Sequence, residues 1–139
     1  MTHHRDAGVV APVETMYLLV FAIVVTALIA FLGRLHAAGV EVSAVAQAAA
    51  RAASMEPSSA TAVTAAERAV VDSPLATRCA GSPSTEVDWS PSPTGTWQGG
   101  SVRVRVVCTV SNASLAGGLL PGTRTISASD SQPIDRYQR

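Results

Sequence analysis

The sequence predicts an α+β protein: a long N-terminal transmembrane helix that continues into an extracytoplasmic helix, a second short helix, and a small antiparallel β-sheet with one disulfide. Three features of the 139-residue chain carry this prediction. An uncharged apolar run fills residues 15–33, an alanine-rich stretch follows it to Ser54, and valines alternate with polar residues over 101–111. The first two patterns are typical of helices, and the third is typical of a strand with one buried face.

The apolar run is long enough to cross a bilayer. Its 19 residues carry no charge and no histidine, and as a helix they span about 28 Å. Eleven large apolar side chains favour its insertion by about 3–7 kcal/mol in total. A cleaved signal peptide is the alternative, although its apolar core is usually only about 7–15 residues long. We therefore expect a short cytoplasmic leader over 1–13, a transmembrane helix over 14–33, its extracytoplasmic continuation over 34–54, and an α+β domain over 58–139.

The orientation in the cell membrane follows mainly from what comes after the run. Arg5 precedes the run and Arg34 follows it directly, so the bias of positive charge is weak. The long C-terminal part carries both cysteines, Cys79 and Cys108, and such a pair in a small exported domain is typical of a disulfide. We expect a single-pass protein with its N-terminus in the cytoplasm and a Cys79–Cys108 disulfide outside it. Two buried free thiols are the alternative.

Two features in or next to the run could serve contacts with other helices as well as anchoring. Pro12 suits the first position of a helix, which places Glu14 in the first turn, where the helix dipole favours a carboxylate. The alternative is a functional acid at the membrane edge, where an unpaired ionisable group is costly. Ala22, Thr26 and Ala30 lie four residues apart and form a stripe of small side chains that lets helices approach closely in lipid. The high alanine content of the whole chain is the competing explanation.

Strong helix formers carry the first helix on to Ser54, where Met55 to Ser59 and above all Pro57 end it. Its expected apolar face contains two valines and two alanines: Val42, Val45, Ala49 and Ala52.

A second helix is expected over about 60–71. Ser59 is the expected cap, and Val63, Ala66 and Val70 give the helix an apolar side.

The remaining chain predicts a small sheet. The clearest strand covers 101–111, where alternation turns Cys108 and four valines toward the core and turns Arg103, Arg105 and Thr109 outward. Shorter strands are expected near 85–89 and over 123–129. The segment 112–122 reads as a Gly/Pro loop, and 130–139 as an exposed polar tail.

Composition and motifs argue against several function classes. Ten arginines balance ten acidic residues, so there is no electrostatic footprint for nucleic acid. No G-x-S-x-G, H-E-x-x-H or Gly-rich phosphate loop is present. Glu86 and Asp88 are best explained as a solvated strand face, and His3 and His4 as part of a polar N-terminus. We expect no catalytic residue, metal, cofactor or small-molecule substrate, and therefore no enzyme.

The order of several short motifs resembles one known family. A polar leader with a glycine precedes an acid and the apolar helix, followed by Phe31-Leu32-Gly33-Arg34, the Ala/Arg stretch 46–54, the strand 102–110, and the segments 121–128 and 133–137. This order, over nearly the whole chain, resembles the actinobacterial TadE-like family, the pseudopilins or minor pilins of the tight-adherence (Flp, type IV-like) pilus system.

The resemblance implies a role in assembling an adhesive pilus or a related secretion apparatus. The implied partners are the membrane lipid bilayer, other Tad pseudopilins, the Flp-type major pilin and inner-membrane platform proteins. It also implies cleavage by a prepilin peptidase between Gly8 and Val9, with Glu14 as an assembly acid. Glu14 is six residues after Gly8, one more than the family pattern has.

A different class of function is a membrane-anchored envelope protein that binds a partner through its extracytoplasmic sheet. Arg103 and Arg105 form a small basic stripe on that sheet. We expect them mainly to keep the outer face soluble, with partner docking as the alternative.

Overall fold

The computed structural model describes residues 7–90, 92, 99–118 and 121–134, and its architecture is α+β, as predicted. In chain order the elements are α1 (Ala7–Ser54), α2 (Ser59–Val71), α3 (Leu75–Arg78), β1 (Ser84–Ser90), β2 (Ser101–Ser111), α4 (Asn112–Leu115) and β3 (Thr123–Pro133).

The chain divides after Arg34 into two compact units. The first unit holds the N-terminal part of α1, and we call residues 12–34 the apolar half of this helix. The second unit, which we call the head, begins at Leu35. It contains the head half of α1, residues 35–54, together with all the other helices and strands.

A three-stranded antiparallel sheet forms the centre of the head, in the order β1-β2-β3. Its middle strand, β2, has the predicted bounds, and its alternate side chains are fully or almost fully buried, as predicted: Val102, Val104, Val106, Cys108 and Val110. The strand expected near 85–89 is also confirmed, as β1.

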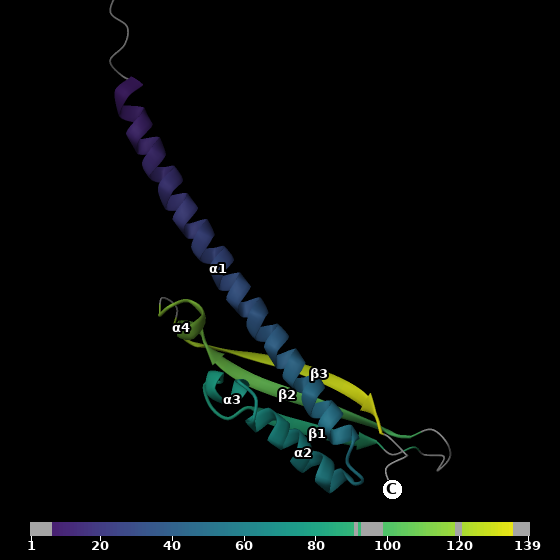
Figure 1. Cartoon of the computed structure of the whole chain (residues 1–139). Helices are drawn as coiled ribbons and strands as arrows, with labels where there is room; N and C mark the ends of the chain where they lie inside the picture. The colour runs from purple at the N-terminus through teal and green to yellow at the C-terminus, as the bar shows by residue number, and fades with distance from the viewer. Residues whose placement is uncertain (1–6, 91, 93–98, 119–120, 135–139) are drawn as a thin grey trace, which may run out of the picture. The chain divides into compact units, whose positions relative to one another are not determined.

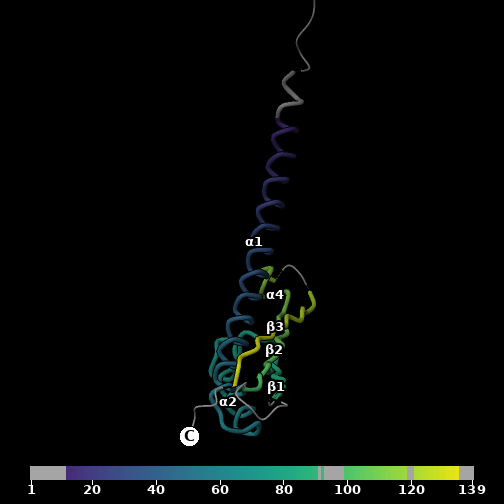
Figure 2. Tube along the Cα trace, turned by 90° about the vertical axis from the view of Figure 1, so that its right-hand side faces the viewer, coloured from purple at the N-terminus to yellow at the C-terminus, as the bar shows by residue number. Residues whose placement is uncertain are grey.

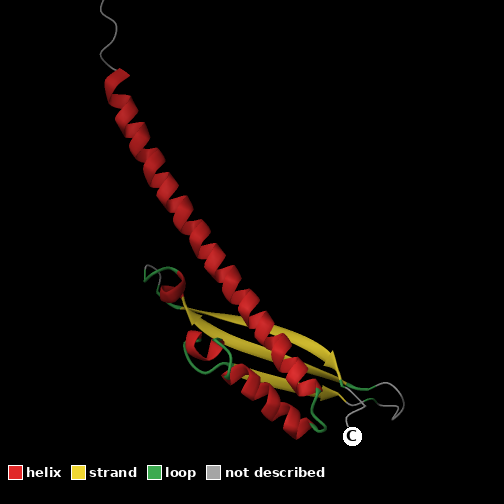
Figure 3. Ribbon diagram, in the orientation of Figure 1, coloured by secondary structure: helices red, strands yellow, loops and turns green. Residues whose placement is uncertain are grey.

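Two helices cover one face of this sheet and leave the other face open. Figure 2 shows the head half of α1 and α2 on one side and the strands on the other, and Figure 3 shows the same two layers from the front. In Figure 1, the head half of α1 crosses the strands obliquely and runs in the same general direction as β1 and β3. The inward side chains of β2 are therefore covered, while the odd-numbered residues from Ser101 to Arg105 remain exposed.

The head half of α1 contributes a broader buried face than the sequence predicted. Its core residues are mostly alanines: Val42, Val45, Ala46, Ala49, Ala50 and Ala53. Ala52, which was expected among them, is only half-buried. Six residues of this half are buried, so its covered face is wider than one narrow stripe.

The second helix confirms one prediction and corrects two. It ends at Val71 as expected, but its cap is Ser58 and not Ser59. Ser58 has an extended backbone, and its hydroxyl accepts a hydrogen bond from the N–H of Thr61, which is the geometry an N-cap requires. The buried side is Ala62, Ala66 and Val70, while Val63 is 37% exposed.

The last strand is longer than predicted. β3 continues past Ser129 to Pro133, because β2 extends to Ser101 and supplies a backbone partner for each added residue. The prediction that an exposed polar tail begins at residue 130 is therefore wrong, because residues 130–133 belong to β3. A short helix, α4, occupies the start of the predicted loop, and Gly122, at φ +100°, turns the chain into β3 while its carbonyl accepts from the N–H of Asn112.

Candidate functional site

The apolar half of α1 exposes a long hydrophobic surface. Twelve of its large apolar side chains are each between 50% and 74% exposed. In water, such exposure is unfavourable by about 25 cal/mol per Å² of apolar surface, and patches of this extent mark sites of contact with membranes or proteins. Within the described residues, one helix is long and apolar enough to cross a membrane, judged by its length and composition, and it is α1.

Glu14 does not lie in the first turn of the helix, contrary to the prediction. α1 begins at Ala7, so Pro12 lies inside the helix, and the first turn holds no acid. The proline removes one hydrogen bond, to the carbonyl of Gly8, and apolar helices can compensate for such a loss locally. Because the effect of the helix dipole falls off within the first turn, it no longer explains the exposed carboxylate of Glu14. The alternative that remains is a functional acid at the membrane edge.

The predicted small-residue stripe lies on an exposed surface. Ala22, Thr26 and Ala30 are all exposed and occupy one side of α1, since residues four apart are neighbours on a helix. The hydroxyl of Thr26 donates to the carbonyl of Ala22 at 2.7 Å. This internal bond satisfies the hydroxyl, so the stripe can face lipid or another helix without an unpaired polar group.

Gly8 and Val9, the residues of the expected processing site, lie in the first turn of α1. The backbone there is helical, and the side chains of residues 7–11 lie outside the described part. The first four N–H groups of a helix have no partner within it, so this turn unwinds at lower cost than the interior of α1.

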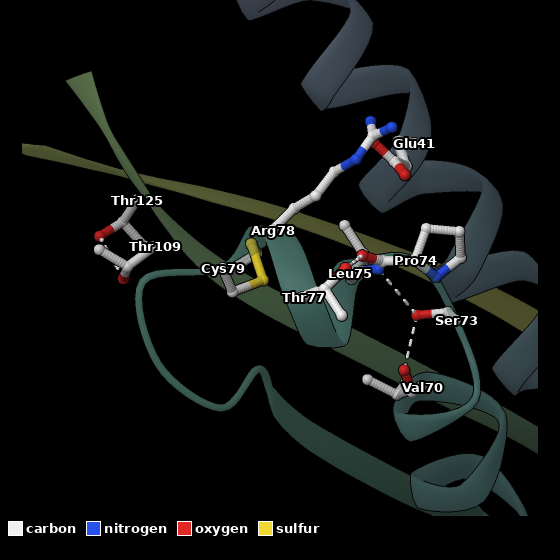
Figure 4. The surroundings of a disulfide bond; sticks show 11 residues. Glu41, Val70, Ser73, Pro74, Leu75, Thr77, Arg78, Cys79, Thr109 and Thr125 are labelled. Carbon is white, nitrogen blue, oxygen red and sulfur yellow. Dashed lines mark hydrogen bonds and ion pairs between the residues drawn. A yellow bond between two sulfur atoms is a disulfide. The ribbon is translucent and has the colours of Figure 1, made fainter. Parts of the chain in front are cut away.

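The predicted disulfide is present. Cys79, directly after α3, is bonded to Cys108 in β2, with the two Cα atoms 5.4 Å apart. Next to it, the N–H of Ala80 donates to the carbonyl of Thr109 at 2.6 Å. Figure 4 shows this junction between the end of α3 and the middle strand. The chain between α2 and β1 is therefore attached to β2 both covalently and through the backbone.

An ion pair that the sequence did not reveal extends this junction to α1. The Nη1 atom of Arg78 lies 2.6 Å from Oε2 of Glu41, and Figure 4 shows Arg78 reaching from α3 to the head half of α1. The two residues are 37 positions apart, so no local pattern could have paired them. Because the arginine side chain is 66% exposed, solvent screens the pair, which contributes only about 0–1 kcal/mol.

The open face of the sheet gathers the charged strand residues. Register places Glu86 opposite Arg105 and Asp88 opposite Arg103, and all four side chains are exposed. With serines of β3 they line a shallow hollow of about 410 Å³. Sequence reasoning treated the acids and the arginines separately and missed that they are neighbours on adjacent strands.

The described residues contain no group of three or more His, Cys, Asp or Glu side chains that could hold a metal ion. His3 and His4 lie outside the described residues. No family model, curated protein or solved structure matches this chain significantly. The exposed apolar helix, the disulfide junction and the open charged face are therefore the features from which a function is inferred.

Proposed function

We propose that the chain is a non-enzymatic pseudopilin or minor pilin of the TadE-like kind, acting in the assembly of a tight-adherence pilus or a related secretion apparatus. The observation that carries the proposal is the division of one helix into two halves. The apolar half exposes its large side chains, whereas the head half buries a face of small ones in an α+β head. Such a chain combines an element for packing in lipid with a small domain for partner choice.

The disulfide supports the placement of the head outside the cytoplasm. Cys79–Cys108 lies wholly in the head, and disulfides persist in oxidising compartments. If α1 crosses the membrane, a head outside the cytoplasm places the N-terminal end of α1 on the cytoplasmic side.

Assembly through helix packing is supported by the stripe of Ala22, Thr26 and Ala30. In lipid there is no hydrophobic force between helices, so close backbone approach along small residues is a main source of association. Glu14, which the helix dipole does not explain, provides a polar contact for a neighbouring helix at the same level. Cleavage between Gly8 and Val9 would require only the first turn of α1 to unwind.

A deletion strain tests the proposal. We expect loss of surface pili or of the secreted product, restored by the wild-type chain but not by a variant with Ala22→Leu, Thr26→Leu and Ala30→Leu. That variant keeps the span apolar, so it should remain in the membrane and fail only in packing. Normal piliation in the deletion strain would contradict the proposal.

The mature N-terminus, measured by mass spectrometry, refines the role. A start at Val9 would identify a processed, pilin-like subunit, and an intact Met1 would identify a permanent membrane component of the apparatus. A start beyond Ala38 would exclude a membrane anchor altogether.

The second candidate is a single-pass envelope protein that binds a partner through its sheet. The open charged face favours it, because its four charged side chains are exposed. Combined substitution of Ala22, Thr26 and Ala30 by leucine separates the two roles. A pseudopilin that assembles through α1 would lose piliation, while a protein that binds its partner through the sheet would keep its function.

A further inference from the structure

The open face of the sheet has an ordered charge pattern. We call six residues the outer face: Glu86 and Asp88 on β1, Arg103 and Arg105 on β2, and Ser127 and Ser129 on β3. Because side chains on one face alternate along each strand, they form three columns: an acidic column, a basic column and a hydroxyl column. The hollow of about 410 Å³ lies among them.

Among the described residues, the arginines of this face form no ion pair within the head. Although Glu86 stands opposite Arg105 and Asp88 opposite Arg103, neither arginine forms an ion pair with a described residue. Asp88 accepts only a long hydrogen bond, 3.4 Å, from the hydroxyl of Ser90. Both columns are exposed and can meet charges on another molecule.

We propose that the outer face binds a second copy of this chain, face to face, about a two-fold axis parallel to the strands. An axis passing between β1 and β2 lays the acidic column of each copy over the basic column of the other. It preserves height along the strands, so the register of β1 and β2 places Glu86 over the second copy's Arg105, and Asp88 over the second copy's Arg103. Each copy contributes the same two pairs, as an isologous contact requires.

The same charges disfavour the other face-to-face arrangement. A two-fold axis in the plane of the sheet but perpendicular to the strands would lay acid over acid and arginine over arginine, and like charges in an interface cost several kcal/mol. The axis parallel to the strands has a second consequence. The head half of α1 runs obliquely but in the general direction of β1 and β3 (Figure 1), so the axis preserves the component of its direction along the strands in both copies. Two heads can therefore pair with the head halves of α1 running in the same general direction.

The contact is small, since it is about two strands wide and adjacent strands are about 4.8 Å apart. The surface area that it buries is below the roughly 1,200 Å² that stable dimers in solution bury. Tethering to one membrane raises the effective concentration of the partner to the millimolar range, so a weak charged contact is sufficient there. The proposal extends the assembly role to the head, but it requires only that two copies share a membrane.

Energy transfer between copies in lipid vesicles tests the proposal. The full chain carries Thr64→Cys on the exposed side of α2 as its labelling site, because both native cysteines are in the disulfide. We expect transfer that falls when NaCl is raised from about 0.05 M to about 1 M, where screening shortens the reach of charges to about 3 Å.

Two charge variants give the decisive comparison. Arg103→Glu with Arg105→Glu makes the face wholly acidic, and Glu86→Arg with Asp88→Arg makes it wholly basic. Each alone should associate at least about tenfold more weakly than the wild type. Mixed with each other they should associate again, because each acidic column then meets a basic one. Arg68→Glu, a charge reversal on α2 away from this face, is the matched control and should change nothing.

The mixing result also shows that both variants fold, and unreactive native cysteines confirm this for each alone. Arg103→Gln with Arg105→Gln removes the attraction without adding repulsion, and this variant should also lose transfer. Wild-type transfer in either reversed variant, or a mixture no better than its components, would overturn the proposal. Transfer that depends on Ala22, Thr26 and Ala30 but not on the outer face would likewise overturn it, while leaving the proposed function intact.

Discussion

The two halves of α1 belong to one helix and have opposite surroundings. Residues 12–34 expose large side chains, such as Phe21 at 67% and Ile29 at 64%. Residues 35–54 bury a face built mainly from alanine, with Ala46, Ala49 and Ala50 fully covered. Both halves form helix, although valine, isoleucine and threonine are frequent in the first and alanine in the second. The size of the side chains distinguishes the halves, and it determines what each half can pack against.

Large apolar side chains suit an environment that adapts to them, as lipid does. Alanine suits a rigid surface that the helix backbone must approach closely. The alanines in the buried face of the head half let its backbone approach the rest of the head closely. One continuous helix therefore has two parts that suit different surroundings.

The largest expected effect comes from placing charge in the apolar half. Val24→Arg with Leu28→Arg should disfavour membrane insertion by about 5–7 kcal/mol, enough to cancel the favourable transfer of the whole run. We expect the variant to be lost from carbonate-washed membranes. Val40→Arg is the matched control, because Val40 is equally exposed, at 57%, but lies in the head half. If the double variant stays in the membrane like the control, the two halves do not differ as described.

Removing the disulfide tests how strongly the link between α3 and β2 stabilises the head. The bridge closes a loop with a separation of 29 residues, so Cys79→Ala with Cys108→Ala should lower the free energy of unfolding by about 3–4 kcal/mol. Chemical denaturation of the chain in detergent measures this loss. Membrane association should be unchanged, since it depends on the apolar half. Equal stability of the two forms would mean that α3 is fixed without the bridge.

A smaller effect distinguishes the two sides of the head half. Ala49→Leu inserts a large side chain where Ala49 is fully buried and should destabilise the head by about 1–3 kcal/mol. Ala48→Leu makes the same substitution one residue earlier on the exposed side and should be nearly neutral. Thermal unfolding followed by the near-ultraviolet dichroism of the tryptophans compares them. Equal melting temperatures would contradict the assignment of the buried face.

The smallest expected effect concerns α2, the helix that covers the same face of the sheet as α1. Ser58→Ala should remove the cap of α2 and cost about 1 kcal/mol, within a range of 0.5–2. Ser59→Ala should cost much less, since this residue begins the helix and does not cap it. The melting temperatures of the two variants decide between the observed cap and the one expected from the sequence.

Long, regular patterns were predictable. The end of α1 at Ser54, both bounds of β2 and the pairing of Cys79 with Cys108 follow from composition, alternation and the presence of a single cysteine pair. The bounds of β2 depend on many residues that agree with one another, whereas Pro57 marks the end of α1 and a single cysteine pair leaves only one possible disulfide.

The predictions that failed depended on single residues or on partners distant in sequence. Pro12 was expected to start α1, yet α1 begins at Ala7, because proline only permits a helix start and does not impose one. Residues 130–133 are polar and poor strand formers, yet they extend β3 because β2 offers them backbone partners. The exposure of Val63 follows from where the sheet lies relative to α2, which the sequence of the helix does not encode.

The charged outer face illustrates the same limit. The alternation of β1 and β2 predicted which residues point outward, but not that Glu86 would stand beside Arg105. That pairing follows from the register of two strands joined by a long connection. The ion pair of Arg78 with Glu41 likewise depends on tertiary placement alone.

We propose that the apolar half of α1 holds a folded head outside the cytoplasm. The most direct test is labelling of Arg68→Cys, an exposed position on α2, with a membrane-impermeant maleimide in intact cells. We expect full labelling without permeabilisation, on a protein that stays in the membrane fraction after a carbonate wash. Labelling only after permeabilisation, or a labelled protein that is washed from the membrane, would contradict the account.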